Sequence, residues 1–266
     1  MKYFIKRMYV LLVRFGINPI AMWKSIAGLP FFIKDVFVFF WQKHKSDEKQ
    51  HFSFGLVYPI LDERFQEGGS ASGHYFHQDL LVAQRVFKNN PTIHLDIGSR
   101  VDGFVAHVAS FRKIEVLDVR STETEVSNVL FKTADLMQLN ESLIDYCDSL
   151  SCLHALEHFG LGRYNDPVKY DGYLDGLNSM YQILKTGGKL YVSVPIGRQR
   201  VEFNAHRVFS MPYLLNLFDG KYIIDHFSYV DDNGDLHKNV AIGGETGISK
   251  NFNCSYGCGI FEMTKI

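Results

Sequence analysis

Two features of this 266-residue chain have the residue types and spacing that hold a nucleotide. A glycine turn, Gly98-Ser99-Arg100, follows the β-rich run 92–97. Asp118 ends a second β-rich run, 113–118, about 20 residues after Gly98. A carboxylate at that spacing accepts hydrogen bonds from ribose hydroxyls in nucleotide-binding folds. We therefore expect a ribose at Asp118, and an exocyclic amine of adenine at Asp135, which follows a third run.

Arg100 distinguishes this turn from a dinucleotide fingerprint. Gly98 and Gly103 match the first and third glycines of that pattern, but Arg100 stands at the second. A side chain there crowds an approaching pyrophosphate, so the sequence argues against NAD and FAD. It favours a nucleotide cofactor without a pyrophosphate, and a dinucleotide oxidoreductase is kept as a minor alternative.

A polar cluster with His154, Glu157 and His158 follows the fourth β-rich run, 148–153. Its letters match the H-x-x-E-H motif of zinc proteases, which needs both His on one helix. Here His154 is expected at a strand end, so the cluster is expected to line the mouth of a sheet without a metal. A zinc hydrolase is kept as a minor alternative. The four cysteines are spaced poorly for zinc and are expected to be buried reduced thiols (Cys147, Cys152, Cys254, Cys258).

Further acid–base residues follow the β-rich run 189–194. Glu202 and His206 are candidates for general acid or base, and Asn204 is a candidate for binding a hydroxyl. The predicted catalytic set consists of Glu202 and His206 together with His154 and Glu157. The alternative is that this stretch is a solvated connecting segment.

The elements that must position these side chains alternate along the chain. Helical spacing of apolar residues predicts helices between the β-rich runs, and the glycine pair 187–188 is interpreted as a helix stop (74–88, 103–111, 172–185, 211–218). Late strands are expected at 221–230 and 259–265, and a loop at 53–73. Alternating strands and helices predict a mostly parallel sheet with helices on both faces, and ligands bind such sheets at the carboxyl ends of the strands.

Charge is balanced overall, with 28 Lys and Arg against 29 Asp and Glu, so no strongly basic nucleic-acid binder is indicated. The first fifty residues differ, because they carry nine Lys or Arg, three acids and both Trp. Helices are predicted at 2–15 and 30–44, the second beginning at Pro30. The longest uncharged apolar runs have six residues, against about 20 for a bilayer span, so neither a membrane span nor a signal peptide is expected. This arm is expected to pack on the body or on a second copy, or to lie on an anionic membrane.

The combined pattern resembles class I S-adenosylmethionine-dependent methyltransferases. The resemblance is carried by Leu95–Ser99, Asp118, Ala134-Asp135-Leu136, the block 148–158, Leu184–Val192 and His206–Ser210. A closer likeness, over about residues 55–266, is to an uncharacterised bacterial and animal family, described only as a domain of unknown function. That likeness is carried by residues 69–79, 151–164 and 202–209. Bacterial members of the family often lie among surface-polysaccharide genes.

The resemblance implies a Rossmann-like α/β fold and S-adenosylmethionine as the cofactor. It implies that the methionine pocket is shaped by Asp96, Gly98 and Ser99, that Asp118 holds the ribose, and that Asp135 with Leu136 holds the adenine. Arg100 stands where the class has a glycine, and it either binds the carboxylate of the cofactor or blocks the pocket.

The expected organisation is a basic helical arm, residues 1–50, followed by a methyltransferase-like domain, residues 51–266. The expected activity is methyl transfer to a sugar or glycan intermediate of surface-polysaccharide biosynthesis, in the cytoplasm or at the inner face of the membrane. The alternative is a non-catalytic binding module for a glycan precursor or a protein partner. Expected partners are a small-molecule or glycan acceptor, a membrane surface contacted through residues 1–45, and a second copy of the chain; no nucleic acid is expected.

Overall fold

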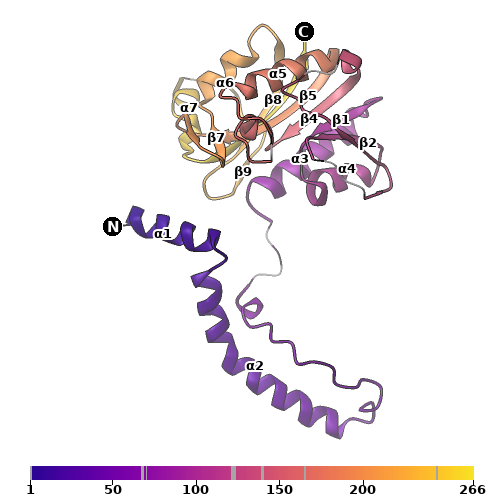
Figure 1. The fold of residues 1–266 in the computed structure, drawn as a ribbon, viewed down its shortest axis with the longest axis vertical. Coiled ribbons are helices and arrows are strands. Elements are labelled where there is room, and N and C mark those ends of the chain that lie inside the picture. Colours follow the sequence, from indigo (N-terminus) through magenta and orange to yellow (C-terminus); the bar gives the residue numbers. More distant parts are fainter. Residues whose placement is uncertain are drawn as a thin grey trace. The chain divides into compact units, whose positions relative to one another are not determined.

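The computed structural model describes residues 2–66, 69, 71–120, 124–138, 141–164, 166–243 and 245–266. The chain divides into two compact units, Met1–Ser70 and Ala71–Ile266. The second unit contains the predicted sheet (Figure 1). The loop expected at 53–73 contains a short 3-10 turn, η1 (Glu63–Phe65). Gly68 and Ser70 of that loop lie outside the described residues.

Eight strands form the main sheet, in the order β3-β2-β1-β4-β5-β10-β8-β9. They are β1 (His94–Ile97), β2 (Ile114–Asp118), β3 (Val129–Thr133), β4 (Cys147–Leu153), β5 (Leu184–Ile196), β8 (Tyr222–Val230), β9 (Leu236–His237) and β10 (Gly257–Lys265). The first five pair in parallel, whereas β10 runs antiparallel to β5 and β8. The prediction of a mostly parallel sheet is therefore confirmed, and the carboxyl ends of β1 to β4 meet at one edge.

Helices cover both faces of this sheet, as Figure 1 shows. On one face lie α3 (His74–Asn89), the π-helical turn η2 (Val101–Val105) and α4 (Ala106–Ala109). On the other lie α5 (Gly172–Ile183) and α6 (Met211–Phe218), with α7 (Glu245–Ser249) near the end of α6. Each face buries its own apolar core, with Val82 and Phe104 in one and Met180 and Leu214 in the other. The helices therefore lie where the alternation of strands and helices predicts them.

The glycine pair after α5 does not end that helix, so this prediction is wrong. The helix ends at Ile183, and β5 begins at Leu184 and contains both glycines. Between the pairs Cys147↔Leu184 and Ser149↔Lys189, β4 advances by two residues and β5 by five. The surplus residues of β5 bulge out, and Gly187 supplies the left-handed φ of +78° that this bulge needs.

A hairpin, which the sequence did not indicate, follows β5. It consists of β6 (Arg200–Glu202) and β7 (His206–Val208), which pair antiparallel. Asn204 has a φ of +63° in the turn between them. Asn tolerates that conformation, so its type is explained by the turn.

The first unit contains α1 (Lys2–Arg14) and α2 (Pro19–Lys45). The predicted start of the second helix at Pro30 is wrong. Asn18 caps the helix by accepting the N–H groups of Ile20 and Ala21 at 3.2 and 3.1 Å, and Pro19 occupies the first turn. With 27 residues, α2 is about 40 Å long. By length and composition alone α2 could cross a bilayer. This differs from the expectation, drawn from the six-residue uncharged apolar runs, that the arm contains no membrane span.

Candidate functional site

The carboxyl ends of β1 to β4 open into a cleft made of two adjoining cavities. Their volumes are about 60 and 450 Å³, and the larger one lies within the range of roughly 300–1,000 Å³ that is usual for small-molecule sites. The cavities share five lining residues (Gly98, Asp118, Arg120, His154, Tyr164). The cleft therefore lies where open α/β sheets bind their ligands.

The buried Asp96 carboxylate fixes the turn that follows β1 by accepting hydrogen bonds from it. Its carboxylate accepts the N–H of Ser99 at 3.0 Å, the hydroxyl of Ser99 at 2.7 Å and the hydroxyl of Ser151. Burial raises the pKa of Asp96 to about 6, although these hydrogen bonds oppose the shift. Gly98 has a φ of +65°, and a Cβ there would meet the Cβ of Ala155 at 3.2 Å. Gly98 and Ser99 thus line the cleft, and the Asp96 carboxylate beneath them holds Ser99 in place.

Arg100 lies outside the smaller cavity and lines only the larger one. Its guanidinium makes a bidentate ion pair with Asp102, with distances of 3.0 and 2.7 Å, and lies 5.1 Å from the ring centre of Tyr75. Slightly more than half of the side chain is exposed. The Arg100 side chain therefore leaves the smaller cavity open in this conformation.

Asp118, at the end of β2, lines both cavities, but its carboxylate already has a partner. Arg120 donates Nε at 2.9 Å and Nη2 at 2.7 Å to it, and the Arg120 backbone N–H donates at 2.9 Å. Burial raises the pKa of Asp118, but these hydrogen bonds outweigh burial, and the net pKa is lowered. Arg120 also stacks on Tyr164 at 4.5 Å. A ribose at Asp118 must therefore share the carboxylate with Arg120 or displace it.

The smaller cavity has an apolar wall next to Asp135. Asp135 follows β3, lines this cavity, and accepts the backbone N–H of Met137 at 2.9 Å. Leu136 is buried and lines the same wall, together with Ala134, Met137 and Phe159. An apolar slot edged by one carboxylate suits a heteroaromatic ring with an exocyclic amine.

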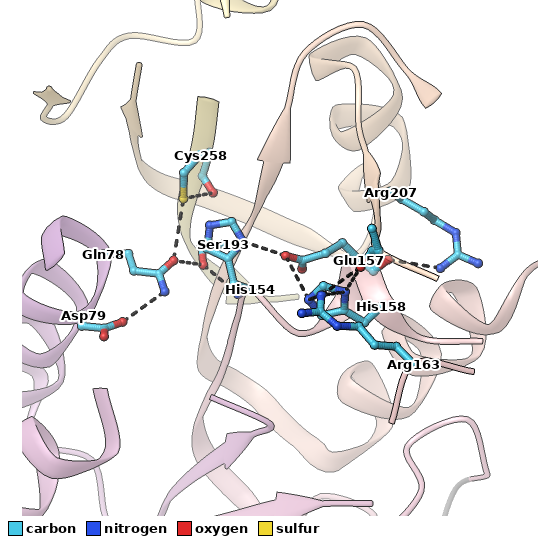
Figure 2. Close-up of polar contacts among 11 residues, drawn as sticks. Gln78, Asp79, His154, Glu157, His158, Arg163, Ser193, Arg207 and Cys258 are labelled. Atoms are coloured by element: carbon cyan, nitrogen blue, oxygen red, sulfur yellow. Dashed lines mark hydrogen bonds and ion pairs between the residues drawn. The ribbon is translucent and has the colours of Figure 1, made fainter. Parts of the chain in front are cut away.

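His154 and Glu157 form a buried pair at the end of β4 (Figure 2). His154 has a left-handed φ of +52°, and its Nδ1 lies 2.6 Å from Glu157 Oε1. Burial lowers the pKa of His154, but Cys258 and Glu157 outweigh it, and the net pKa is raised well above the ordinary value. The pKa of Glu157 is lowered, because the contact with His154 outweighs the effect of burial. His154 and Glu157 therefore form a close, buried pair at the end of β4.

The helix that a zinc protease needs does not follow His154. Leu156–His158 is a 3-10 turn, η4, and His158 Nδ1 donates to the carbonyl of Ala205 at 2.7 Å. His154 and His158 both approach Glu157 Oε1, at 2.6 and 3.8 Å, from a strand end and from a 3-10 turn rather than from one helical face. The sequence argument against that motif is therefore confirmed.

Glu202 and His206 lie on the β6–β7 hairpin, apart from the residues that line the two cavities. Their side chains approach at 3.6 Å, and Glu202 also binds Arg200 at 3.0 Å. The His206 ring packs against Tyr256 at 4.9 Å. Its Nε2 is buried and has no hydrogen-bond partner among the described residues. The hairpin reaches the cleft through Ala205, whose carbonyl holds His158.

Several residues at the site were missed by the sequence reading. Arg120 lies two residues after Asp118 and belongs to no motif, and Tyr164 ends the stretch 151–164 of the family likeness but was given no role. Arg207 is buried and donates to the carbonyls of Phe159 at 2.6 Å and Tyr170 at 2.7 Å. All four cysteines are free and buried, as predicted.

Comparison with known proteins gives one family match. The model of a family described as "Caenorhabditis protein of unknown function, DUF268" matches residues 106–243, more than half of the chain. No curated protein matches the chain by sequence.

Several solved structures are similar to this one. The [4+2]-cyclase SpnF is 15% identical, with a TM-score of 0.51 over 71% of this chain and 80% of that one. The N-methyltransferase NodS from Bradyrhizobium japonicum WM9, in complex with S-adenosyl-L-homocysteine, is 11% identical, with a TM-score of 0.48 over 73% and 88%. Phosphoethanolamine N-methyltransferase 2 from Haemonchus contortus is 12% identical, with a TM-score of 0.48 over 76% and 56%. At 15% identity the similarity to SpnF shows a shared fold and nothing finer.

Proposed function

The chain belongs to the DUF268 family, and we propose that it transfers a methyl group from S-adenosylmethionine to a hydroxyl of a sugar or glycan intermediate. The observation that carries the proposal is the cleft, in which the carboxylates that follow β2 and β3 flank one apolar slot. This arrangement fits an adenosine: Asp118 would face the ribose hydroxyls, and Asp135 with Leu136 would face the adenine. The turn Gly98-Ser99 would border the methionine part.

The cofactor supplies a methyl group that is already activated by a sulfonium. This chain then has to hold the acceptor in line with that methyl group and remove the hydroxyl proton. Among the four predicted catalytic residues, His206 is the best candidate for the base. Its Nε2 makes no hydrogen bond within the described residues, although it lies 3.6 Å from Glu202 Oε2, and its pKa is lowered. The Nε2 of His154 is unbonded as well, but the pKa of His154 is raised. Burial lowers the pKa of His206, although Glu202 and Glu157 oppose the shift, so the ring is neutral near pH 7 and can accept a proton.

A third cavity, of about 230 Å³, is lined in part by Arg207 and supports the proposal of a polyhydroxylated acceptor. Its lining combines tyrosine rings with hydrogen-bonding groups (Tyr170, Tyr173, Gln199, Arg200, Arg207, Tyr213). Arg207 binds the carbonyl of Phe159, from the cofactor cleft, and that of Tyr170, from this cavity. The sugar or glycan class itself rests on the family likeness.

The test is transfer of labelled methyl groups to a panel of activated sugars and lipid-linked glycan precursors. We expect label in at least one acceptor, and a loss of about 10²–10⁴-fold in rate for His206→Gln with unchanged cofactor affinity. The occupied carboxylate of Asp118 favours one alternative, a binding module without chemistry. Saturable binding of a glycan precursor without transfer to any acceptor would favour that module.

Residues 1–45 are proposed to bring the protein to an anionic membrane surface at the cytoplasmic face. Large apolar side chains of α2 are exposed, including Trp23, Phe37 and Trp41 at 70, 72 and 61%, and basic residues accompany them. We expect the full chain to bind phosphatidylserine vesicles and the chain without residues 1–45 not to bind. Equal binding of both would remove the proposal, and a dimer of the full chain that dissociates on truncation would assign the helix to a second copy instead.

A further inference from the structure

Three side chains that ligate transition metals meet beside the cleft, from three different elements. His74 begins α3, His154 follows β4, and Cys258 lies on β10. Their ligand atoms all lie within 4.8 Å of one another. We propose that His74, His154 and Cys258 bind a divalent transition metal ion of the zinc class, with one coordination position left open. This proposal goes beyond methyl transfer and does not depend on it.

His154 has the arrangement of a metal-binding histidine. Its Nδ1 is held at 2.6 Å by the Glu157 carboxylate, and its Nε2 is buried without a hydrogen-bond partner among the described residues. The Cys258 sulfur faces that nitrogen (Figure 2). In metal sites, a carboxylate on one ring nitrogen typically orients the other nitrogen toward the ion.

His74 and Cys258 complete the donor set. The His74 ring stacks on the His154 ring at 5.2 Å and 6°, and a hydrogen bond to the backbone of Tyr256 fixes it. Cys258 is fully buried, and its Sγ lies 3.7 Å from Gln78 Oε1, which also accepts the Ser193 hydroxyl at 2.6 Å. Every ligand therefore has a contact that can hold its orientation.

The donor types indicate zinc. Two imidazoles and one thiolate form a set that zinc prefers, and three protein ligands leave a position for water or a substrate oxygen. No fourth His, Cys, Asp or Glu joins the cluster within the described part of the chain. Because His154 also lines both cavities, the ion would lie next to the cleft.

The competing interpretation is a reactive Cys258 thiolate activated by His154 and Glu157. Complete burial of Cys258 argues against it, because a nucleophile must reach its substrate. The third donor, His74, also has no role in such a relay. The contacts therefore favour the metal.

The experiment uses the full-length protein without cofactor, loaded with zinc or with cobalt and desalted. We expect about one zinc per chain by elemental analysis, and a thiolate-to-cobalt charge-transfer band in the cobalt form. Cys258→Ser should abolish the band, and Cys254→Ser, which changes a buried free cysteine outside the cluster, should keep it. Glu157→Gln should weaken zinc binding 10–100-fold, with circular dichroism unchanged.

Absence of zinc and of the band in the wild-type protein would overturn the proposal without reference to any variant. Equal zinc affinity of Cys258→Ser and Cys254→Ser would overturn it as well. Rapid carboxymethylation of Cys258 in a metal-free protein would assign the cluster to nucleophilic chemistry instead. Because no cofactor is present, failure of methyl transfer does not affect any of these outcomes.

Discussion

Arg120 determines how accessible the Asp118 carboxylate is to a ligand in the cleft. Its ion pair with Asp118 is bidentate, yet 57% of the Arg120 side chain is exposed. Exposed ion pairs contribute about 0–1 kcal/mol, so a ligand that offers two hydroxyls can compete for the carboxylate. The pair therefore limits cofactor affinity only weakly.

Replacing Arg120 by Ala should tighten binding of S-adenosylhomocysteine by up to about fivefold, which corresponds to 1 kcal/mol. Titration calorimetry measures this, with the exposed Arg198→Ala as the control. A loss of more than tenfold would show instead that Arg120 itself holds the ligand.

Asp96 gives the protein a pH-dependent stability. Its pKa is raised from the ordinary 3.8 to about 6, so this carboxyl stabilises the fold below pH 4 and loses that contribution as the pH rises through 6. The shift corresponds to about 3 kcal/mol. The Asp96→Asn variant has no carboxyl at this position and should not lose this contribution. Between pH 4 and pH 7 the free energy of unfolding of the wild type should therefore fall by about 3 kcal/mol relative to that of the variant. Denaturant unfolding between pH 4 and 7 tests this, and parallel profiles would contradict it.

At the scale of elements, the segment from η4 to α5 covers the cleft because its backbone approaches itself closely. Gly160 has a φ of +74°, and a Cβ there would lie 2.0 Å from the carbonyl oxygen of Lys169. Arg207 ties the same segment to β7 through the carbonyls of Phe159 and Tyr170. This packing positions His158 and Tyr164 over the cavity.

Gly160→Ala should therefore destabilise the protein by more than about 2 kcal/mol and weaken cofactor binding. Gly220→Ala is the matched control, because Gly220 has a similar φ of +67° but open space around its Cβ position. Its expected cost is about 1 kcal/mol, from backbone strain alone. Equal unfolding midpoints for the two variants would argue against the steric explanation.

Local sequence patterns predict most helices and strands correctly. They fail where the pairing between strands determines the boundary of an element. The span of α6, 211–218, follows from its own apolar spacing and agrees with the structure. The glycine pair 187–188 has the residue type of a helix stop, yet the register between β4 and β5 assigns it to a bulge. The sequence also contains the Asn18-Pro19 start of α2, whereas the prediction placed the start of this helix at Pro30.

For the site, the sequence predicts the strand-end residues but not their partners. Asp118 and Asp135 follow from strand order alone, because parallel strands end at one edge. His74 and Cys258 are separated by more than 180 residues, and only the sheet order β4-β5-β10 with α3 above it brings them to His154. Spacing rules for metal sites do not detect such distant ligands.

At the scale of the whole molecule, the second unit contains both apolar cores and the cleft. A chain of residues 71–266 should therefore fold on its own and bind S-adenosylhomocysteine within about twofold of the full chain, since no cleft residue is removed. Circular dichroism and calorimetry test this. An unfolded fragment would mean that the first unit is required for stability.

The central claim is that the cleft binds S-adenosylmethionine through Asp118, and calorimetric titration of the full chain with S-adenosylmethionine and S-adenosylhomocysteine tests it most directly. We expect saturable binding of both, lost in Asp118→Ala and retained in Asp219→Ala, an exposed acid that lines none of the cavities described above. Well-folded wild-type protein that binds neither compound, or an Asp118→Ala variant that binds both with unchanged affinity, would contradict it.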